Sequence, residues 1–317
     1  MSRKQFIATA IVGLSISTFA QAQTWQPPSD SERCPSPWGE GDQRGAGNQQ
    51  NPELVMRAVS LIRNGEVIEL GHVLHADIPM SPWRQFSVHT KRTDEPAGSN
   101  RRRSSEELIV SELGHVGTQF DGFAHQSIGD SYYNCFTIGG TATRTGFSAL
   151  GVEQVGAIVT RGVLLDIAAL KGVARLGETY EITVEDIEQA LERQELELEA
   201  GDAVVINTGW GALYEADPAR YQATNPGIGV TAAEWLAGHS PILVGADTSP
   251  VEVRPNPDPE ISLPIHQIML VVHGIHLLEN LKLDELTAAG IHEFALIVQP
   301  LKIKGGTGST VAPIAVH

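Results

Sequence analysis

Apolar residues recur along this chain with two different periods, one typical of helices and one typical of strands. From Asn51 to Arg63 they recur every three or four residues, and Asn51 followed by Pro52 is a typical helix start. The predicted helices are 51–63, 183–192, 231–237 and 263–273. Short apolar runs bounded by turn residues predict strands at 67–70, 157–166, 202–208, 242–246 and 294–300. Helices and strands that alternate in this way are typical of an α/β fold with a partly parallel sheet.

Two polar segments interrupt this pattern. Residues 23–52 are rich in Pro, Gly, Ser, Asn and Gln, and we expect them to form an extended arm on the surface. Residues 79–104 are expected to form a polar loop that carries a basic cluster, Lys91, Arg92 and Arg101–Arg103. This cluster is either a solvated surface or a contact for an anionic ligand or another subunit.

The first 22 residues have the composition of a secretory signal peptide. Arg3 and Lys4 precede a short apolar run, and residues 20–22 form a small-residue cleavage site. The apolar run is too short to span a bilayer. We therefore expect a periplasmic or secreted protein. Its mature part, residues 23–317, is interpreted as a single domain because no change of composition marks a second one.

The composition limits the classes of function. The chain has 317 residues, 22 Lys+Arg and 38 Asp+Glu, which gives a formal net charge of −16. Such an acidic chain lacks the basic face that nucleic-acid binding needs. Its two cysteines, Cys34 and Cys135, are too few for a cysteine zinc site, and in an oxidising compartment they could form a disulfide. The motifs of P-loop nucleotidases, serine α/β-hydrolases and HExxH metalloproteases are absent from the sequence.

The segment from His115 to His125 carries the most informative chemistry. Within eleven residues it places His115, Gln119, Asp121 and His125, whose nitrogen and oxygen atoms are donors for zinc, manganese and related ions. On a straight strand His115 and Gln119 would lie roughly 13 Å apart, which is too far for one ion. A bend at Gly117 would bring them together. The spacing therefore predicts a kinked strand or loop around a metal, with ordinary structural histidines as the alternative.

A second group of donors lies downstream, at His266, Gln267, His273, His276 and Glu279. On the last predicted helix, His266 and His273 share one face. His273 and His276 also fit ordinary structural roles at a helix end or in the core. Glu279 has leucines on both sides, and a carboxylate in apolar surroundings needs a partner such as a metal ion.

These residues together resemble the signature of a known family, His-x-Gly-Thr-His-x-Asp-x-x-x-His. The sequence matches it at His115, Gly117, Thr118, Asp121 and His125. Further matching blocks follow in the family's order at 208–210, 245–248, 278–281 and 300–303. Over about residues 36–317, the chain resembles the metal-dependent cyclase-like hydrolases that include bacterial kynurenine formamidases and isatin hydrolases.

The resemblance implies a fold and a site. The implied fold is a swivelling β/β/α domain, usually in a homodimer or homotetramer. His115 and Asp121 match metal ligands of the family, and His125 matches its general acid/base. His266 and Glu279 match the distal pair that serves a second ion in binuclear members, and Glu279 is grouped with His125 among the catalytic residues.

One position departs from the signature, because Gln119 stands where the family has its second histidine. An amide oxygen is a harder and weaker donor than imidazole, so we expect Gln119 to weaken zinc binding and to favour Mn²⁺. One Mn or Zn ion would then be held by His115, Gln119, Asp121 and His266, and the opposite outcome is loss of both metal and catalysis. Gln267 remains an alternative to His266 as the distal ligand.

The implied reaction is hydrolysis of an amide, a cyclic amide or a lactone. Metal-activated water would attack the carbonyl carbon, and His125 would move the proton. Phe123 and residues near Trp83 would form an apolar wall for a small-molecule substrate, with core packing as the alternative. The competing hypothesis is a non-catalytic periplasmic ligand-binding protein that keeps the fold after the change at Gln119. No nucleic-acid partner and no membrane span of the mature chain are expected.

Overall fold

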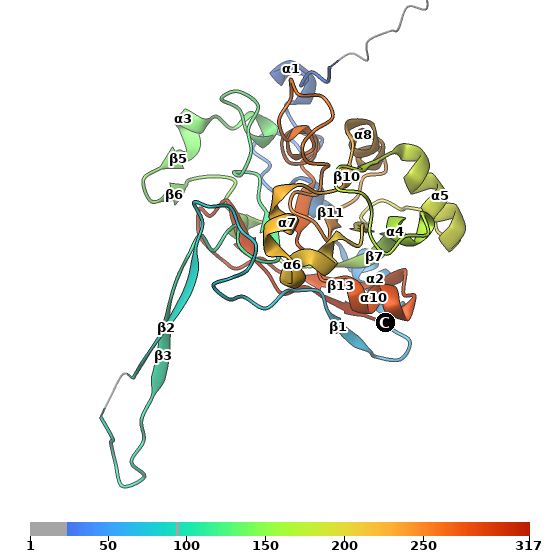
Figure 1. The fold of residues 1–317 in the computed structure, drawn as a ribbon. Helices are drawn as coiled ribbons and strands as arrows, with labels where there is room; N and C mark the ends of the chain where they lie inside the picture. Colours follow the sequence, from blue (N-terminus) through green and yellow to red (C-terminus); the bar gives the residue numbers. More distant parts are fainter. Residues whose placement is uncertain (1–23, 93–94) are drawn as a thin grey trace, which may run out of the picture.

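A nine-stranded mixed sheet lies at the centre of the computed structural model, which describes residues 24–92 and 95–317 (Figure 1). The strand order is β1-β15-β13-β7-β9-β11-β12-β4-β14. The bounds are Val67–Glu69 (β1), Gln119–Asp121 (β4), Ile158–Asp166 (β7), Ala203–Asn207 (β9), Leu243–Ala246 (β11), His276–Glu279 (β12), Glu293–Val298 (β13), Gly308–Thr310 (β14) and Ile314–Val316 (β15). The predicted α/β class is confirmed, and the predicted strands correspond to β1, β7, β9, β11 and β13. The signal peptide predicted at 1–22 lies outside the described residues.

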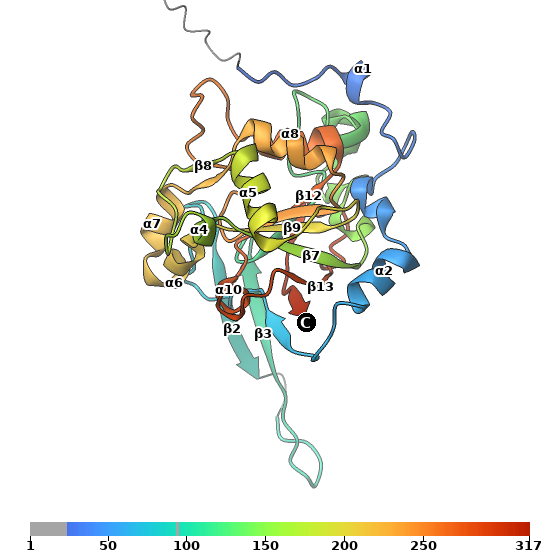
Figure 2. The same ribbon diagram turned by 90° about the vertical axis from the view of Figure 1, so that its right-hand side faces the viewer.

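The middle strands of the sheet are buried on both faces. β7, β9, β11 and β12 run parallel, whereas β13 and β4 pair with this group antiparallel. Successive side chains of a strand point to opposite faces, so Val163 packs into one core and Leu164 into the other. Helices α5 (Val184–Gln194) and α8 (Val230–Gly238) cover the first face, and α10 (Asp284–Ala289) lies on the second (Figure 2). Burial on both faces explains the continuous apolar runs in these strands.

Capping side chains determine where two of the predicted helices begin. The side chain of Asn51 accepts hydrogen bonds from the backbone N–H groups of Glu53 and Leu54 at the start of α2 (Pro52–Val59). This helix ends four residues earlier than predicted. Thr183 caps α5 in the same way, as part of a capping box.

The last predicted helix takes a different form. Residues 263–273 form a short α-helix, α9 (Pro264–His266), followed by a wider π-helical turn, η5 (Gln267–His273). Gly274 ends this turn with a φ of 61°, in the left-handed region. His266 is buried in the protein, whereas His273 is exposed at the surface. The predicted shared face of these two histidines is therefore wrong, because the wider turn changes the helical spacing.

The loop predicted at 79–104 is also wrong. Much of this segment belongs to β2 (Phe86–Arg92), which pairs antiparallel with β3 (Ser105–Ser111) over seven matched positions. The hairpin projects away from the central sheet in both views (Figures 1 and 2). Both of its faces are exposed over most of its length, so no alternation of apolar and polar residues marks it in the sequence.

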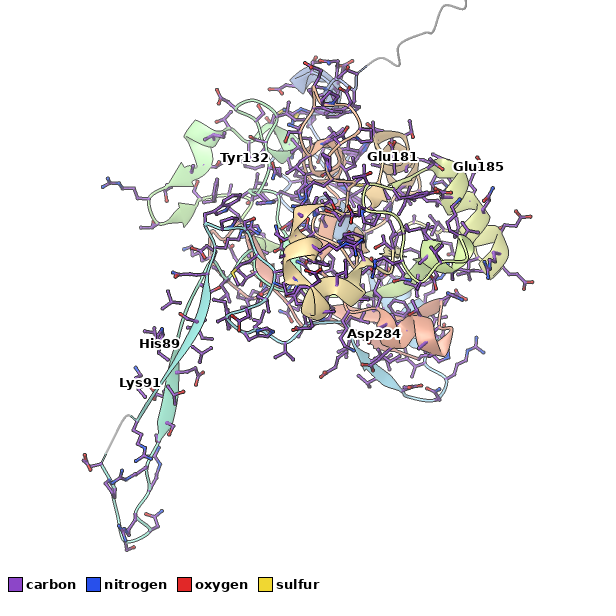
Figure 3. The ribbon with its side chains drawn as sticks, viewed as in Figure 1. His89, Lys91, Tyr132, Glu181, Glu185 and Asp284 are labelled. Atoms are coloured by element: carbon purple, nitrogen blue, oxygen red, sulfur yellow. A yellow bond between two sulfur atoms is a disulfide. The ribbon has the colours of Figure 1, made fainter. Side chains whose placement is uncertain are left out.

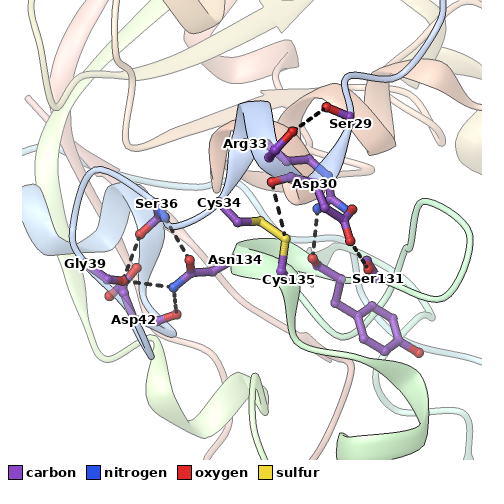
Figure 4. The surroundings of a disulfide bond; sticks show 12 residues. Ser29, Asp30, Arg33, Cys34, Ser36, Gly39, Asp42, Ser131, Asn134 and Cys135 are labelled. Carbon is purple, nitrogen blue, oxygen red and sulfur yellow. Dashed lines mark hydrogen bonds and ion pairs between the residues drawn. A yellow bond between two sulfur atoms is a disulfide. The ribbon is translucent and has the colours of Figure 1, made fainter.

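A disulfide ties the amino-terminal segment to the loop that follows the His115–His125 motif. It joins Cys34 to Cys135, whose Cα atoms lie 6.0 Å apart (Figure 4). Beside it, the amide of Asn134 accepts a hydrogen bond from the backbone of Ser36 at 2.8 Å and donates one to the carbonyl of Gly39 at 3.0 Å. The disulfide that the sequence left open is thus formed, and it anchors this segment to the body.

The remaining elements are short. They are α1 (Asp30–Arg33), η1 (Gly45–Gln49), η2 (Tyr133–Cys135), α3 (Ile138–Thr141), β5 (Ala142–Thr143), β6 (Gly146–Phe147), η3 (Val152–Gln154), α4 (Ile167–Leu170), β8 (Glu181–Ile182), η4 (Trp210–Ala212), α6 (Leu213–Ala216), α7 (Pro218–Ala223) and β10 (Gly227–Ile228). The segment 23–52, expected to be extended, is therefore partly helical. Within the described part of the chain, no helix combines the length and the apolar character that crossing a bilayer requires.

Replacing Asn51 by Ala should lower the free energy of unfolding by about 1 kcal/mol, because two backbone N–H groups at the start of α2 lose their acceptor. Chemical denaturation measures this change. Met56→Ala is the matched control, since Met56 lies on the same helix and is 63% exposed. It should change the stability by less than about 0.5 kcal/mol. Equal effects of both substitutions would contradict the capping role.

Candidate metal centre

Strand β4 carries the middle of the sequence motif and lies between β12 and β14. Its register places Gln119 opposite Glu279 of β12. Just before β4, Gly117 adopts a φ of 65°, and a Cβ atom added there would lie 2.2 Å from the side chain of Leu74. Only glycine fits this bend. The predicted bend at Gly117 is therefore present, and His115 lies within reach of the strand that follows it.

Three buried side chains, Asp121, His266 and Glu279, converge beside this strand. The Nε2 atom of His266 lies 3.5 Å from Oδ2 of Asp121 and 3.2 Å from Oε1 of Glu279. Both of these oxygens are buried without a hydrogen-bond partner among the described residues. Donor atoms that share one tetrahedral ion at about 2.1 Å lie about 3.4 Å from one another. The spacing and the orphaned oxygens therefore fit a divalent cation.

Glu252 fixes the orientation of His266. Its Oε1 atom accepts hydrogen bonds from Nδ1 of His266 at 2.5 Å and from the backbone N–H of the same residue at 3.2 Å. Its Oε2 atom accepts from the backbone N–H of Ile265 at 3.1 Å. With Nδ1 bound in this way, Nε2 is the ring nitrogen that faces Asp121 and Glu279, as in carboxylate–histidine–metal arrangements. The sequence reasoning missed Glu252, although its place between Val251 and Val253 marked a carboxylate in apolar surroundings.

The electrostatics of the cluster also fit a bound cation. Burial alone lowers the pKa of His266, but the neighbouring carboxylates of Asp121, Glu252 and Glu279 outweigh burial and raise this pKa well above its usual value. Burial raises the pKa of Asp121, yet its interactions with His125, His115 and His266 hold this pKa well below its usual value. The cluster thus favours positive charge among its carboxylates. Imidazole and carboxylate donors together suit zinc or manganese.

His115 and His125 line the other side of Asp121. Nδ1 of His115 lies 3.3 Å from Oδ1 of Asp121 and is buried without a hydrogen-bond partner. Its Nε2 atom shares a hydrogen bond of 2.8 Å with the hydroxyl of Thr307, and its ring stacks on that of His125 with the centroids 4.1 Å apart. Thr307 also accepts a hydrogen bond from the backbone of Gly122. The glycine-rich run around Thr307 thus supports this motif.

Gln119 bridges the two carboxylates. Its side chain is buried, and its Nε2 atom lies 3.0 Å from Oε2 of Glu279 and 3.5 Å from Oδ1 of Asp121. The amide therefore donates hydrogen bonds to both groups. Ligation of a metal through the amide oxygen of Gln119, which the sequence suggested, requires the opposite orientation of the amide.

The other downstream donors lie elsewhere. The amide of Gln267 donates to the carbonyl of Ser127 at 3.0 Å. His273 pairs with Glu234 at the surface, at 3.1 Å. His276 is buried in the core, with Nδ1 2.9 Å from a backbone carbonyl. Of the two candidates for the distal position, only His266 faces the carboxylates.

A cavity of about 800 Å³ opens onto this cluster. It is lined by Ser81, Trp83, Arg84, Gln119, His125, Gln126, Gln222, Ser249, Pro250, Arg254, Pro255, Asn256, Asp258, Pro259, Ile261, Ser262, Leu263, His266 and Glu279. Trp83 is 75% exposed and lies at its rim, and its expected role in a substrate wall stays a prediction. Phe123 is only 1% exposed and stacks on His276, so its place in that wall is corrected to core packing.

Comparison with known proteins identifies the family of this chain. The sequence matches the model of the Cyclase family over residues 68–253. A crystal structure described as a novel cyclase shares 30% sequence identity and a TM-score of 0.82, over 92% of this chain and 100% of that chain. The chain therefore belongs to the cyclase family, and the resemblance inferred from the sequence is confirmed.

More distant structures share the fold. Isatin hydrolase A from Labrenzia aggregata has 24% identity and a TM-score of 0.59, over 81% of this chain and 94% of its own. A predicted metal-dependent hydrolase from Bacillus stearothermophilus has 19% identity and a TM-score of 0.51, over 80% of this chain and 98% of its own. No curated protein matches the sequence.

Replacing Glu252 by Gln should weaken binding of Zn²⁺ or Mn²⁺ about 10–100-fold, because a neutral amide no longer orients and polarises His266. Competition with a chromophoric chelator measures the affinity. Glu234→Gln is the matched control, since it alters the surface pair with His273. That control should bind metal like the wild type. Unchanged affinity in the Glu252 variant would show that this carboxylate does not support a metal ligand.

Proposed function

We propose that this chain is a metal-dependent hydrolase that cleaves an amide, cyclic amide or lactone bond. One observation carries the proposal: the buried cluster of Asp121, His266 and Glu279 opens directly onto a cavity that His125 also lines. A hydrolase needs a centre that activates water, a group that moves a proton and space for a substrate. Membership of the cyclase family, with relatives described as hydrolases, supports the same reaction class.

A divalent cation bound in the cluster supplies polarisation of a carbonyl group and lowers the pKa of water. The protein holds the donor groups in place, with Glu252 orienting His266. His125 moves the proton in this proposal. Burial lowers the pKa of its ring to about 3 although Asp121 acts in the opposite direction. The ring is therefore neutral at neutral pH, a weak base whose protonated form gives up its proton readily. It then returns this proton to the leaving amine or alkoxide.

His115 would complete the ligand set. Its orphaned Nδ1 atom and Oδ1 of Asp121 face each other, and with His125 they form a second group of possible donors. We therefore propose a primary ion at Asp121, His266 and Glu279, with His115 adding a donor or contributing to a second ion. In this proposal Glu279 is a metal ligand, and it also remains, with His125, among the catalytic residues.

The charge of the cavity wall favours substrates and products with a carboxylate. Arg84 is held by the backbone carbonyl of His115 at 2.7 Å, and Arg254 by the carbonyl of Gln222 at 2.5 Å. These contacts are to uncharged carbonyl groups, so neither contact neutralises the charge of its guanidinium group. Hydrolysis of an amide or a lactone releases a carboxylate, which such groups bind well. Exposed Trp83 would contact an apolar part of the substrate.

We also propose that the protein is exported and that residues 23–317 are the mature domain. The composition of residues 1–22 supports export. The disulfide between Cys34 and Cys135 supports it as well, because disulfides persist in oxidising compartments.

Replacing Gln119 by His should raise the affinity for Zn²⁺ relative to Mn²⁺, because imidazole is the softer donor. Metal affinities of both proteins, measured by competition with a chelator, test this. Gln267→His is the control, because Gln267 donates to Ser127 and does not face the carboxylates. An unchanged zinc-to-manganese preference in the Gln119 variant would argue that this position does not touch the metal.

Replacing His125 by Ala should lower kcat by roughly 10²–10⁴-fold while the bound metal is retained. Turnover is measured on a panel of cyclic amides and lactones that includes isatin, and elemental analysis gives the ions per chain. Full activity of the variant would refute the proton-transfer role. A wild-type protein that binds metal but turns over no member of the panel, or binds no metal after incubation with Mn²⁺ and Zn²⁺, would favour the non-catalytic binding protein that Gln119 suggests.

A further inference from the structure

Arg254 lines the cavity and has hydrogen-bond donors without a partner in the protein. It lies in the loop between β11 and α9, in the wall of the cavity that opens onto the metal centre. A guanidinium group has five N–H donors. The Nη2 atom of Arg254 donates to the carbonyl of Gln222 at 2.5 Å, whereas its Nε atom is buried with no hydrogen-bond partner among the described residues. Arg254 therefore offers unpaired donors to a molecule that binds in the cavity.

Other buried arginines of this protein are paired with carboxylates. Arg33 lies 2.5 Å from Asp30, and Arg161 lies 3.2 Å from Glu199. Such pairing matters because a guanidinium group taken out of water is costly without an anion.

Arg254 forms no ion pair with any of the described residues. Burial lowers the pKa of Arg254, and the charge of Glu279 opposes this effect. Glu279 belongs to the metal cluster, so in the proposed function its charge is already balanced by the cation. The environment of Arg254 therefore lacks the anion that its own charge requires.

The buried Asn225 fixes the backbone at Arg254. The backbone N–H of each of these residues donates to the carbonyl of the other, both at 3.0 Å. The side-chain amide of Asn225 also donates to the carbonyls of Pro250 at 3.1 Å and Glu252 at 2.8 Å. The same loop thus carries Arg254 and the carboxylate of Glu252 that orients His266. Arg254 is therefore held in a set position relative to the metal ligands, as a group that recognises a substrate must be.

The positive charge of the cavity wall contrasts with the acidic character of the chain. The net charge is −16, and the exposed Glu181 and Glu185 are examples of its acidic side chains (Figure 3). Outside the metal cluster, the wall of the cavity carries Arg84 and Arg254 against one acidic residue, Asp258. Because a bound cation balances the carboxylates of the cluster, these two arginines make the cavity attractive to anions.

The two arginines lie beside different members of the centre. Arg84 is held by the carbonyl of His115, whereas Arg254 lies near enough to Glu279 for the charge of that carboxylate to affect its pKa. Hydrolysis of one amide or lactone bond creates one carboxylate, which arises at the scissile carbonyl. A second guanidinium group at a separate place in the wall is therefore available for a second anionic group.

We propose that Arg254 determines specificity by binding a carboxylate that the substrate already carries before hydrolysis. This inference rests on the proposed function, because it names the substrate class of the same cavity. A guanidinium group holds a carboxylate through two parallel hydrogen bonds, and the unpaired Nε atom of Arg254 supplies one of these donors. The substrate is then an amide, cyclic amide or lactone with an acidic substituent. Addition of one water molecule to such a ring amide or lactone opens the ring and gives a product with two carboxylates.

Isothermal titration calorimetry with isophthalate and benzoate tests this role without turnover. Isophthalate carries two carboxylates on one ring, as the product of such a substrate does, whereas benzoate carries one. The metal-loaded wild type should bind isophthalate at least about tenfold more tightly than benzoate, and Arg254→Gln should abolish this difference. Arg193→Gln is the matched control, because Arg193 also donates to a backbone carbonyl, that of Ala169, but is exposed on α5. It should bind both compounds like the wild type, and circular dichroism checks that each variant is folded.

Kinetics on a matched pair of substrates separates specificity from general activity. Isatin-5-carboxylate and isatin-5-carboxamide have the same scissile bond and differ in the charge of the substituent. The wild type should show a kcat/KM at least about tenfold higher for the carboxylate, and Arg254→Gln should bring this ratio close to one, mainly through a higher KM for the carboxylate. Arg254→Lys keeps the charge but not the planar fork, and it should restore part of the preference.

The outcomes separate this inference from the proposed function. A wild type that hydrolyses both isatins equally well and binds isophthalate no better than benzoate would overturn the role of Arg254 and leave the hydrolase function standing. An equal loss of preference in Arg193→Gln would also overturn it, because the effect would then come from net charge alone. A protein that binds isophthalate through Arg254 but hydrolyses neither isatin would support the carboxylate site and refute the proposed reaction on these rings.

Discussion

The burial of several carboxylates around one imidazole is the constraint on which the rest of this structure depends. Asp121, Glu252 and Glu279 all lie within hydrogen-bond or ion-pair distance of His266, and all four residues are buried. Charges taken out of water are costly unless they are paired. Two strands and the loop before α9 must therefore hold their positions closely, because a small shift would leave a buried charge without its partner.

The same network accommodates the amide of Gln119, which stands where the family signature has a histidine. A neutral amide in this position donates hydrogen bonds to Glu279 and Asp121. It thereby separates two carboxylate oxygens that would otherwise repel each other. The likeness to other members of the cyclase family extends over most of the chain. The side chain between the two carboxylates therefore differs from the family signature, while the surrounding fold is shared with the family.

The sequence predicted the parts of the structure that depend on local contacts. The cap at Asn51 and the bend at Gly117 follow from the conformational preferences of single residues, and both were found where predicted. The hairpin of β2 and β3 was missed because both of its faces are exposed, so no alternation of apolar and polar residues marks it in the sequence. Glu252 was missed because its contact with His266 forms only when the loop before α9 folds, and the sequence alone does not show that contact. Phe123 was wrongly placed in the substrate wall, because the periodicity of apolar residues does not show which side of a turn faces the core.

Strand β14 has a consequence for the order in which the molecule matures. It borders β4, yet it comes from residues 308–310, and the contact between His115 and Thr307 joins positions 192 residues apart. Contacts between residues so distant in sequence form late, after most of the chain has been synthesised. A nascent chain that still lacks residues 307–310 thus lacks part of the support for the motif at 115–125. For the proposed metal centre, competence to bind a cation would therefore arise only once residues 307–310 have joined the sheet, which makes this late segment a checkpoint for the centre.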